Sequence, residues 1–227
     1  YSKNDISKTY SISPGKIDVV YNGGNENFSP VDEHTKKATQ LRFTQGCEYF
    51  LYIGGMHARK NVVRLIKAFN EFKKQSDNDI KLLIIGRKNW VEPGLWDEYE
   101  KLEFKNSVLF VGGIYDTMIL RNILASALAM VYVSYFEGFG IPIVEAMYSE
   151  IPVITSNVSC MPEIAGNAAL LVDPFSINSI ADGMKRIYAD RKLREELIEK
   201  GKNRRKVFSW NNTAEKLWES VLKTIQE

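Results

Sequence analysis

Two glutamates, Glu137 and Glu145, flank a glycine corner at residues 138–140. The apolar run 127–134 before the corner indicates a buried strand, and Pro142 after it suits the first turn of a helix. A helix N-terminus carries unpaired amides and a partial positive charge, so this corner could seat an anion such as a phosphate. Because carboxylates do not bind phosphate, the two glutamates need another role, such as general acid and base work or hydrogen bonding to hydroxyl groups.

Two adjacent cations, Arg59 and Lys60, precede a second predicted helix. They follow the apolar segment 49–53, which indicates a strand, and they lie at the start of 61–75, where apolar residues recur at helical spacing. Cations are disfavoured at the positive end of a helix dipole, which favours an anion between them. A nucleoside diphosphate would supply that anion, and each charge-assisted hydrogen bond would contribute on the order of 1.5 to 3 kcal/mol.

Short apolar segments alternate with segments of helical periodicity along most of the chain. The segments that indicate strands are 49–53, 80–86, 108–111, 127–134, 152–155 and 169–172, with a further short candidate at 17–21. Helical patterns cover 61–75, 95–102, 116–124, the residues after Pro142, the stretch from Ile177 and the segment after Trp210, and 31–43 is partly helical. This alternation predicts an α/β fold, a Rossmann-like doubly wound parallel sheet of about six strands with helices on both faces.

Glycines follow four of the predicted strands, at residues 54–55, 86, 112–113 and 138–140. In a doubly wound sheet these turns lie at the carboxyl ends of the strands, where such proteins bind their ligands. Four glycine turns at the same topological position therefore predict a nucleotide crevice along one rim of the sheet.

The composition is that of an ordinary globular protein. The chain has 227 residues, of which 44% are hydrophobic and 26% charged, and its formal net charge of +2 predicts no nucleic-acid partner. The cysteines and histidines show no metal-binding spacing, so no metal is expected. No apolar run approaches the roughly 20 residues of a membrane span and no signal peptide opens the chain, which predicts a cytoplasmic location. The basic cluster 200–206 is predicted to be a solvated helix face.

The segment from Glu137 to Glu145 resembles the Glu-x7-Glu signature of the retaining glycosyltransferases of family 4, also called group 1, which have the GT-B fold. Further points of resemblance lie at 52–61, 65–69, 111–113, 152–155, 161–168, 172–174 and 208–210. The resemblance implies three parts. Residues 1–30 would be an interdomain segment from a missing N-terminal domain, 31–208 a Rossmann-like donor-binding domain that forms the C-terminal half of a GT-B fold, and 209–227 a C-terminal helix packing toward the missing domain.

The resemblance implies transfer of a hexosyl group, with features of mannosyl-type members, from a nucleoside-diphosphate sugar to a glycan or lipid-linked acceptor. The acceptor would bind through the missing N-terminal domain, and the transfer would need no metal and no cofactor besides the donor. The full-length protein would work in the cytoplasm, with peripheral association at the inner face of the membrane. The isolated chain is expected to bind nucleotide and transfer little.

The resemblance also implies roles for residues at the predicted rim. The residues implied in catalysis are Glu137, Lys60 and Arg59. The residues implied in binding the nucleotide sugar are Gly55, Arg87, Gly113, Ile114, Tyr115, Asp116, Gly138, Phe139, Gly140, Ile141 and Glu145. Glu137 would face the donor sugar, and Glu145, in the first turn of its helix, would accept hydrogen bonds from the ribose hydroxyls. Asp116 is also placed to cap the helix that follows it.

This sequence departs from the family pattern at two positions, and each departure predicts a consequence. Gly55 stands where related sequences usually have arginine, so Arg59 is expected to take over phosphate binding. Glu150 stands where the family usually has a glycine, which would end the helix with a positive φ that glutamate adopts only at a cost. Two other functions remain open, a GT-B-like sugar-nucleotide epimerase that uses the same rim and a non-catalytic nucleotide-binding or scaffold module.

Overall fold

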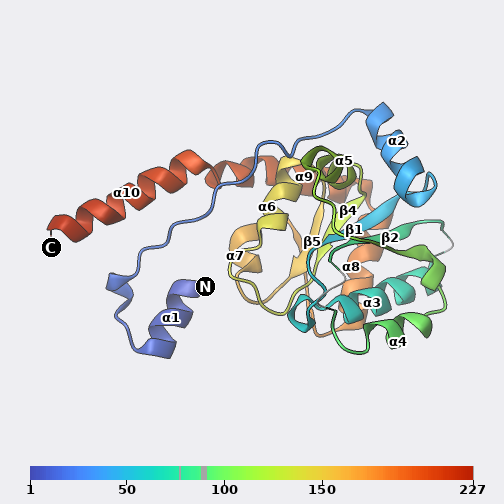
Figure 1. The fold of residues 1–227 in the computed structure, drawn as a ribbon, viewed down its shortest axis with the longest axis horizontal. Helices are drawn as coiled ribbons and strands as arrows, with labels where there is room; N and C mark the ends of the chain where they lie inside the picture. The colour runs from blue at the N-terminus through green and yellow to red at the C-terminus, as the bar shows by residue number, and fades with distance from the viewer. Residues whose placement is uncertain (77, 88–90, 227) are drawn as a thin grey trace.

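A computed structural model describes residues 1–76, 78–87 and 91–226 and contains a six-stranded parallel sheet (Figure 1). The strands are β1 (Tyr49–Ile53), β2 (Lys81–Ile85), β3 (Val108–Val111), β4 (Ala129–Tyr132), β5 (Val153–Ser156) and β6 (Leu170–Val172). Their order across the sheet is β3-β2-β1-β4-β5-β6, and each neighbouring pair is parallel. Because the chain builds outward from β1 first on one side and then on the other, the sheet is doubly wound, and the predicted α/β fold is confirmed.

Helices cover both faces of this sheet. The α-helices of the described residues are α1 (Ser2–Tyr10), α2 (Glu33–Thr44), α3 (Val62–Lys74), α4 (Leu95–Glu100), α5 (Thr117–Ala125), α6 (Ile141–Tyr148), α7 (Met161–Ala165), α8 (Ile177–Ala189), α9 (Arg191–Arg204) and α10 (Trp210–Gln226), of which α1 and α10 lie away from the sheet (Figure 1). Helix α3 packs against α4 and α8, whereas α6 packs against α7 and α9. Figure 1 shows α3, α4 and α8 on one side of the sheet and α5, α6 and α9 on the other.

The central strands β1 and β4 are continuous apolar runs because both of their faces are covered. In β1 the residues from Tyr49 to Tyr52 have no exposed surface, and all of β4 is buried. A sheet with one face in water would alternate apolar and polar residues, whereas a parallel sheet between two helix layers does not. The six main strand predictions therefore lie within two residues of the observed boundaries.

In the N-terminal arm, residues 1–30, the strand predicted at 17–21 is wrong. Residues 17–21 form no strand, and no strand of the described sheet pairs with them. The carbonyl of Tyr21 instead accepts a hydrogen bond from the Thr213 hydroxyl of α10 at 2.7 Å. The β-branched residues of this segment favour extended backbone, but a strand also needs a neighbouring strand to satisfy its backbone groups. Figure 1 shows the arm and α10 extending together away from the sheet.

Helix α10 leaves part of its apolar surface exposed. Leu217, Trp218 and Ile225 are 55%, 60% and 74% exposed. The helix predicted after Trp210 is confirmed, and its packing toward a further domain stays a prediction. In the described segments, the helices all fall short of the length and apolar content that crossing a membrane requires.

Candidate active site

A cleft of about 540 Å³ opens at the carboxyl ends of β1, β2 and β3. The predicted site residues that line it are Gly55, Arg87, Gly113, Ile114 and Tyr115. Gly86 lets two of these strand ends approach, because a Cβ atom there would lie 2.1 Å from the carbonyl oxygen of Gly54. The cleft is as large as a small-molecule site, roughly 300 to 1,000 Å³, and lies on the rim where doubly wound sheets bind ligands.

Arg87 and Tyr115 lie together at the wall of this cleft. The guanidinium carbon of Arg87 lies 5.4 Å from the centre of the Tyr115 ring, which is a cation–π distance. Asp116 follows in the chain but serves the helix. Its Oδ1 accepts hydrogen bonds from the amides of Met118 at 2.8 Å and Ile119 at 3.0 Å, so the predicted cap of α5 is confirmed. Among the described residues, Asp116 is not part of the cleft wall.

Arg59, Lys60 and Glu137 form one compact ionic cluster. Lys60 Nζ lies 2.6 Å from Glu137 Oε1, and Arg59 Nη1 lies 2.8 Å from Glu137 Oε2. Arg59 also donates to the carbonyl of Phe136 at 3.1 Å. The diphosphate predicted between the two cations stays a prediction, and in this structure the anion that contacts both of them is the Glu137 carboxylate.

Burial and charge act in opposite directions on the Glu137 carboxyl. The residue is only 6% exposed, and burial alone raises its pKa. Hydrogen bonding to Lys60 and Arg59 and the positive charge of Lys60 outweigh burial, so the pKa of Glu137 is lowered from its ordinary value. The cluster therefore contains an ionised carboxylate at neutral pH, with two cations held against it.

Two side chains that the sequence did not single out hold the Glu137 turn. The Ser159 hydroxyl accepts a hydrogen bond from the Glu137 amide at 3.1 Å and donates to the Glu137 carbonyl at 3.0 Å. The Cys160 thiol donates to the carbonyls of Glu137 at 3.0 Å and Phe139 at 3.2 Å. The available signal was their place in the turn that follows the predicted strand 152–155, which puts them on the same rim.

The lysine and the residue after it have further partners that sequence reasoning missed. Lys60 Nζ donates to the hydroxyl of Tyr132, the last residue of β4, at 2.7 Å. Asn61 adopts a φ of 62° and is 1% exposed. The side-chain nitrogen Nδ2 of Asn61 donates to the carbonyls of Val133 at 2.9 Å and Pro174 at 2.8 Å. These two hydrogen bonds join the turns after β4 and β6.

In the part of the chain that the structure describes, Glu145 forms no ion pair with the members of this cluster. Helix α6 begins at Ile141, which is 45% exposed, after Gly140 with a φ of 96°. Glu145 is therefore in the second turn, and its predicted place in the first turn is wrong by one residue. Burial raises the pKa of Glu145 to about 7. Within the described residues, no ion pair reaches its carboxylate.

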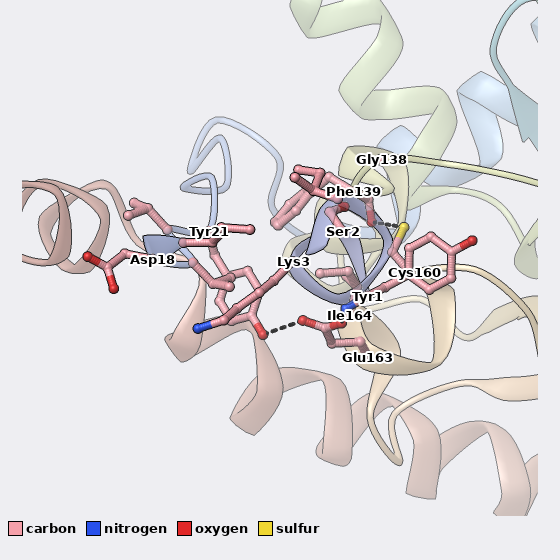
Figure 2. Close-up of a pocket in the computed structure, with 14 residues that line it drawn as sticks. Tyr1, Ser2, Lys3, Asp18, Tyr21, Gly138, Phe139, Cys160, Glu163 and Ile164 are labelled. Carbon is pink, nitrogen blue, oxygen red and sulfur yellow. Dashed lines mark hydrogen bonds and ion pairs between the residues drawn. The ribbon is translucent and has the colours of Figure 1, made fainter. Parts of the chain in front are cut away.

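Gly138 and Phe139 line a second pocket, of about 190 Å³, between the arm and α7 (Figure 2). The Tyr21 hydroxyl donates to Glu163 Oε1 at 2.7 Å, and the ring centres of Tyr21 and Phe139 are 6.1 Å apart. The arm thus contacts the glycine corner that follows Glu137. These two predicted binding residues line a pocket that is separate from the larger cleft.

Two arginines of the basic cluster 200–206 bond backbone carbonyls of neighbouring helices, whereas the sequence predicts a solvated face. Arg204 Nε donates to the carbonyl of Ile164 at 3.0 Å, near the end of α7, and Arg205 Nη1 donates to the carbonyl of Tyr148 at 3.1 Å, at the end of α6. The solvated-face prediction is wrong for these two residues. Glu150 has the positive φ expected at that position, 56°, and its carboxylate pairs with Lys202 at 3.2 Å and Arg205 at 3.3 Å.

The acidic, histidine and cysteine side chains do not gather into a metal site. Within residues 1–76, 78–87 and 91–226, no three of them are grouped so as to hold a metal ion. The expectation that the site works without a metal stays a prediction.

Comparison with known proteins identifies the family of this chain. The sequence model described as "Glycosyl transferases group 1" matches residues 33–204. The chain is 34% identical over 164 residues to O-antigen chain mannosyltransferase B of Escherichia coli, which covers 72% of this chain and 43% of that protein. It is also 34% identical over 185 residues to O-antigen chain mannosyltransferase RfbU of Salmonella typhimurium, which covers 82% of this chain and 48% of that protein. The chain thus spans less than half the length of these two relatives.

Solved structures support the same assignment at the level of the fold. The sucrose-phosphate synthase of Thermosynechococcus elongatus matches 99% of this chain with a TM-score of 0.81 at 25% identity, and the match covers 57% of that protein. Anabaena Alr3699/HepE, solved with UDP and glucose, matches 97% of this chain and 60% of its own with a TM-score of 0.83 at 17% identity. Together with the family match over 33–204, these findings show that the chain belongs to the group 1 glycosyltransferases.

Proposed function

We propose that this chain is the donor-binding domain of a retaining glycosyltransferase, which transfers a hexosyl group from a nucleoside-diphosphate sugar to a glycan or lipid-linked acceptor. The observation that carries the proposal is the convergence of Arg59 and Lys60 on Glu137 at the glycine-lined rim. The cleft beside the Gly113 turn has room for a nucleoside, and the two cations suit a diphosphate. The proposed transfer needs no metal and no cofactor besides the donor.

The cations would act on the leaving group. As the bond between the sugar and the diphosphate breaks, negative charge grows on the phosphate oxygens, and Arg59, Lys60 and the amides of the glycine corner stabilise it. The diphosphate then takes the proton of the incoming hydroxyl, which attacks from the same face of the sugar. Because the hydroxyl attacks from the face that the diphosphate leaves, the configuration at the sugar carbon is retained without an enzyme nucleophile.

The two glutamates would bind hydroxyl groups of the donor. When the cations engage phosphate, Glu137 turns from them toward the sugar hydroxyls. Glu145 accepts hydrogen bonds from the ribose hydroxyls, and its burial means that a bound ribose would replace lost hydration. Both roles use carboxylate oxygens as hydrogen-bond acceptors, and Glu145 would offer both of its oxygens as acceptors once it ionises above about pH 7.

The mannosyl group is the proposed sugar, because both relatives at 34% identity are named mannosyltransferases. The acceptor would bind to a domain outside this chain, and the whole protein would work in the cytoplasm, with peripheral association at the inner face of the membrane.

Calorimetric titration of the 227-residue chain with UDP, GDP and ADP tests the proposal. We expect one of the three to bind, and Lys60→Ala to weaken that binding at least about tenfold, as loss of a charge-assisted hydrogen bond predicts. Lys105→Ala is the matched control, because Lys105 pairs with Glu100 at 2.7 Å and takes no part in the cluster. No binding of any of the three at millimolar concentration would refute the proposed function.

A further inference from the structure

Lys60 is held by two partners of different charge. Its Nζ lies 2.6 Å from the Glu137 carboxylate and 2.7 Å from the Tyr132 hydroxyl, to which it donates a hydrogen bond. The Lys60 side chain is 12% exposed, and Tyr132 is 1% exposed. The ammonium group therefore sits at the buried inner end of the cluster, whereas the Arg59 side chain, at 50% exposure, lies at its outer end.

The two partners differ in what they do when a diphosphate arrives. Glu137 carries a negative charge, so it competes with phosphate for the ammonium group and would be repelled by it. The Tyr132 hydroxyl is neutral and accepts from Lys60 without opposing an incoming anion. A lysine side chain is flexible and loses rotamer freedom when it is held, so a partner that remains in place reduces the cost of binding.

Tyr132 is rigidly placed for this role. As the last residue of β4 it pairs with Thr155 of β5, and its carbonyl accepts a hydrogen bond from the Thr155 hydroxyl at 2.8 Å. Its ring lies nearly parallel to that of Tyr52 in β1, with ring centres 6.4 Å apart and an angle of 18°. Burial raises the pKa of Tyr132, as does the charge of Glu137, so the phenol stays protonated.

We propose that Tyr132 is a positioning residue that keeps the Lys60 ammonium group at the diphosphate site when Glu137 leaves it. The inference rests on the proposed function, because it assumes a nucleoside-diphosphate donor. The sheet itself would then preorganise Lys60, through a neutral hydroxyl at the carboxyl end of β4.

Whether Tyr132 holds the Lys60 ammonium group can be measured without any nucleotide, from the rate at which Lys60 is acetylated. In a Glu137→Gln background, where the charged partner is removed, adding Tyr132→Phe should raise the rate of Lys60 acetylation several-fold, measured by mass spectrometry of proteolytic peptides. Tyr49→Phe in the same background is the matched control. Tyr49 is also a fully buried tyrosine, and its hydroxyl donates to the carbonyl of Ile123 at 2.6 Å, at the opposite end of the sheet from the rim.

The consequence for binding is measured in the otherwise unchanged chain. Tyr132→Phe should weaken binding of the nucleoside diphosphate about tenfold, the effect of losing one hydrogen bond to a charged group, and Tyr49→Phe should leave it unchanged. Unchanged affinity in Tyr132→Phe overturns the inference, and so does weaker binding without faster Lys60 acetylation. If the wild-type chain binds no nucleoside diphosphate, the proposed function fails first, and the acetylation result then shows only whether Tyr132 holds the lysine.

Discussion

Ser159 and Glu137 bond each other twice, through one hydroxyl group. The Ser159 hydroxyl accepts from the Glu137 amide at 3.1 Å and donates to the Glu137 carbonyl at 3.0 Å. Ser159 reaches this position with a φ of 59°, in the left-handed region that residues with a Cβ atom adopt at a cost. Strain next to the ionic cluster is thus offset by bonds that fix the turn bearing Glu137.

Replacing Ser159 tests this arrangement. Ser159→Ala should lower the free energy of unfolding by about 1 to 2 kcal/mol, because both hydrogen bonds are lost and the backbone strain remains. Ser159→Gly loses the same bonds but relieves the Cβ strain of roughly 1 kcal/mol, so it should be more stable than the alanine variant. Urea denaturation followed by circular dichroism measures both. An alanine variant as stable as the wild type would mean that these bonds do not hold the turn.

The ionic cluster makes stability depend on pH in a defined direction. Despite burial, which acts the other way, Lys60 and Arg59 lower the pKa of Glu137. The stability that its ionised form contributes is therefore present above the unfolded pKa of about 4.3 and is lost as the pH falls through the lower folded value. Glu137→Gln should be less stable than the wild type by about 1 to 3 kcal/mol at pH 7, with a smaller difference below pH ~4. Urea denaturation between pH 3 and 8 checks this, and a difference independent of pH would contradict it.

Glu145 should show the opposite dependence. Burial raises its pKa to about 7, so the folded state keeps a proton that the unfolded chain has already released. Stability should therefore fall as the pH rises from about 4.5 to 7, by on the order of a few kcal/mol, and stay low above that. Glu145→Gln removes the ionisation, so it should be more stable than the wild type at pH 8 and similar at pH 4. Denaturation at these two pH values measures both, and a glutamine variant that loses stability at pH 8 would show that the buried acid has a favourable partner there.

The parts of this molecule that the sequence predicts are those governed by local pattern. The strand predicted at 49–53 coincides with β1, because a central strand buried on both faces must be a continuous apolar run. The placement of Arg59, Lys60 and Glu137 on one rim also follows from local pattern, since each lies in a turn between a strand of one parallel sheet and the next helix. Their ionic pairing does not, because it depends on β1 and β4 being neighbours.

The contacts of Ser159 and Tyr132 were beyond sequence reasoning for a physical reason. Ser159 meets Glu137 across 22 residues, and Tyr132 meets Lys60 across 72. Such pairs depend on the strand order and on the rotamers at the rim, neither of which periodicity encodes. The failed strand at 17–21 has the same origin, because its composition indicates extended backbone and says nothing of a neighbouring strand.

The close approach of two strand ends gives the last prediction. A Cβ atom at Gly86 would lie 2.1 Å from the Gly54 carbonyl oxygen, a backbone atom that can move only with the end of β1. Gly86→Ala should therefore cost about 1 to 3 kcal/mol of stability and weaken nucleotide binding, because the shift distorts the cleft. Gly112→Ala is the matched control, since a Cβ atom at Gly112, after β3, has no neighbour within 4 Å. Thermal unfolding and calorimetric titration of the two variants measure both effects, and equal behaviour of the two would show that the β1 and β2 ends tolerate separation.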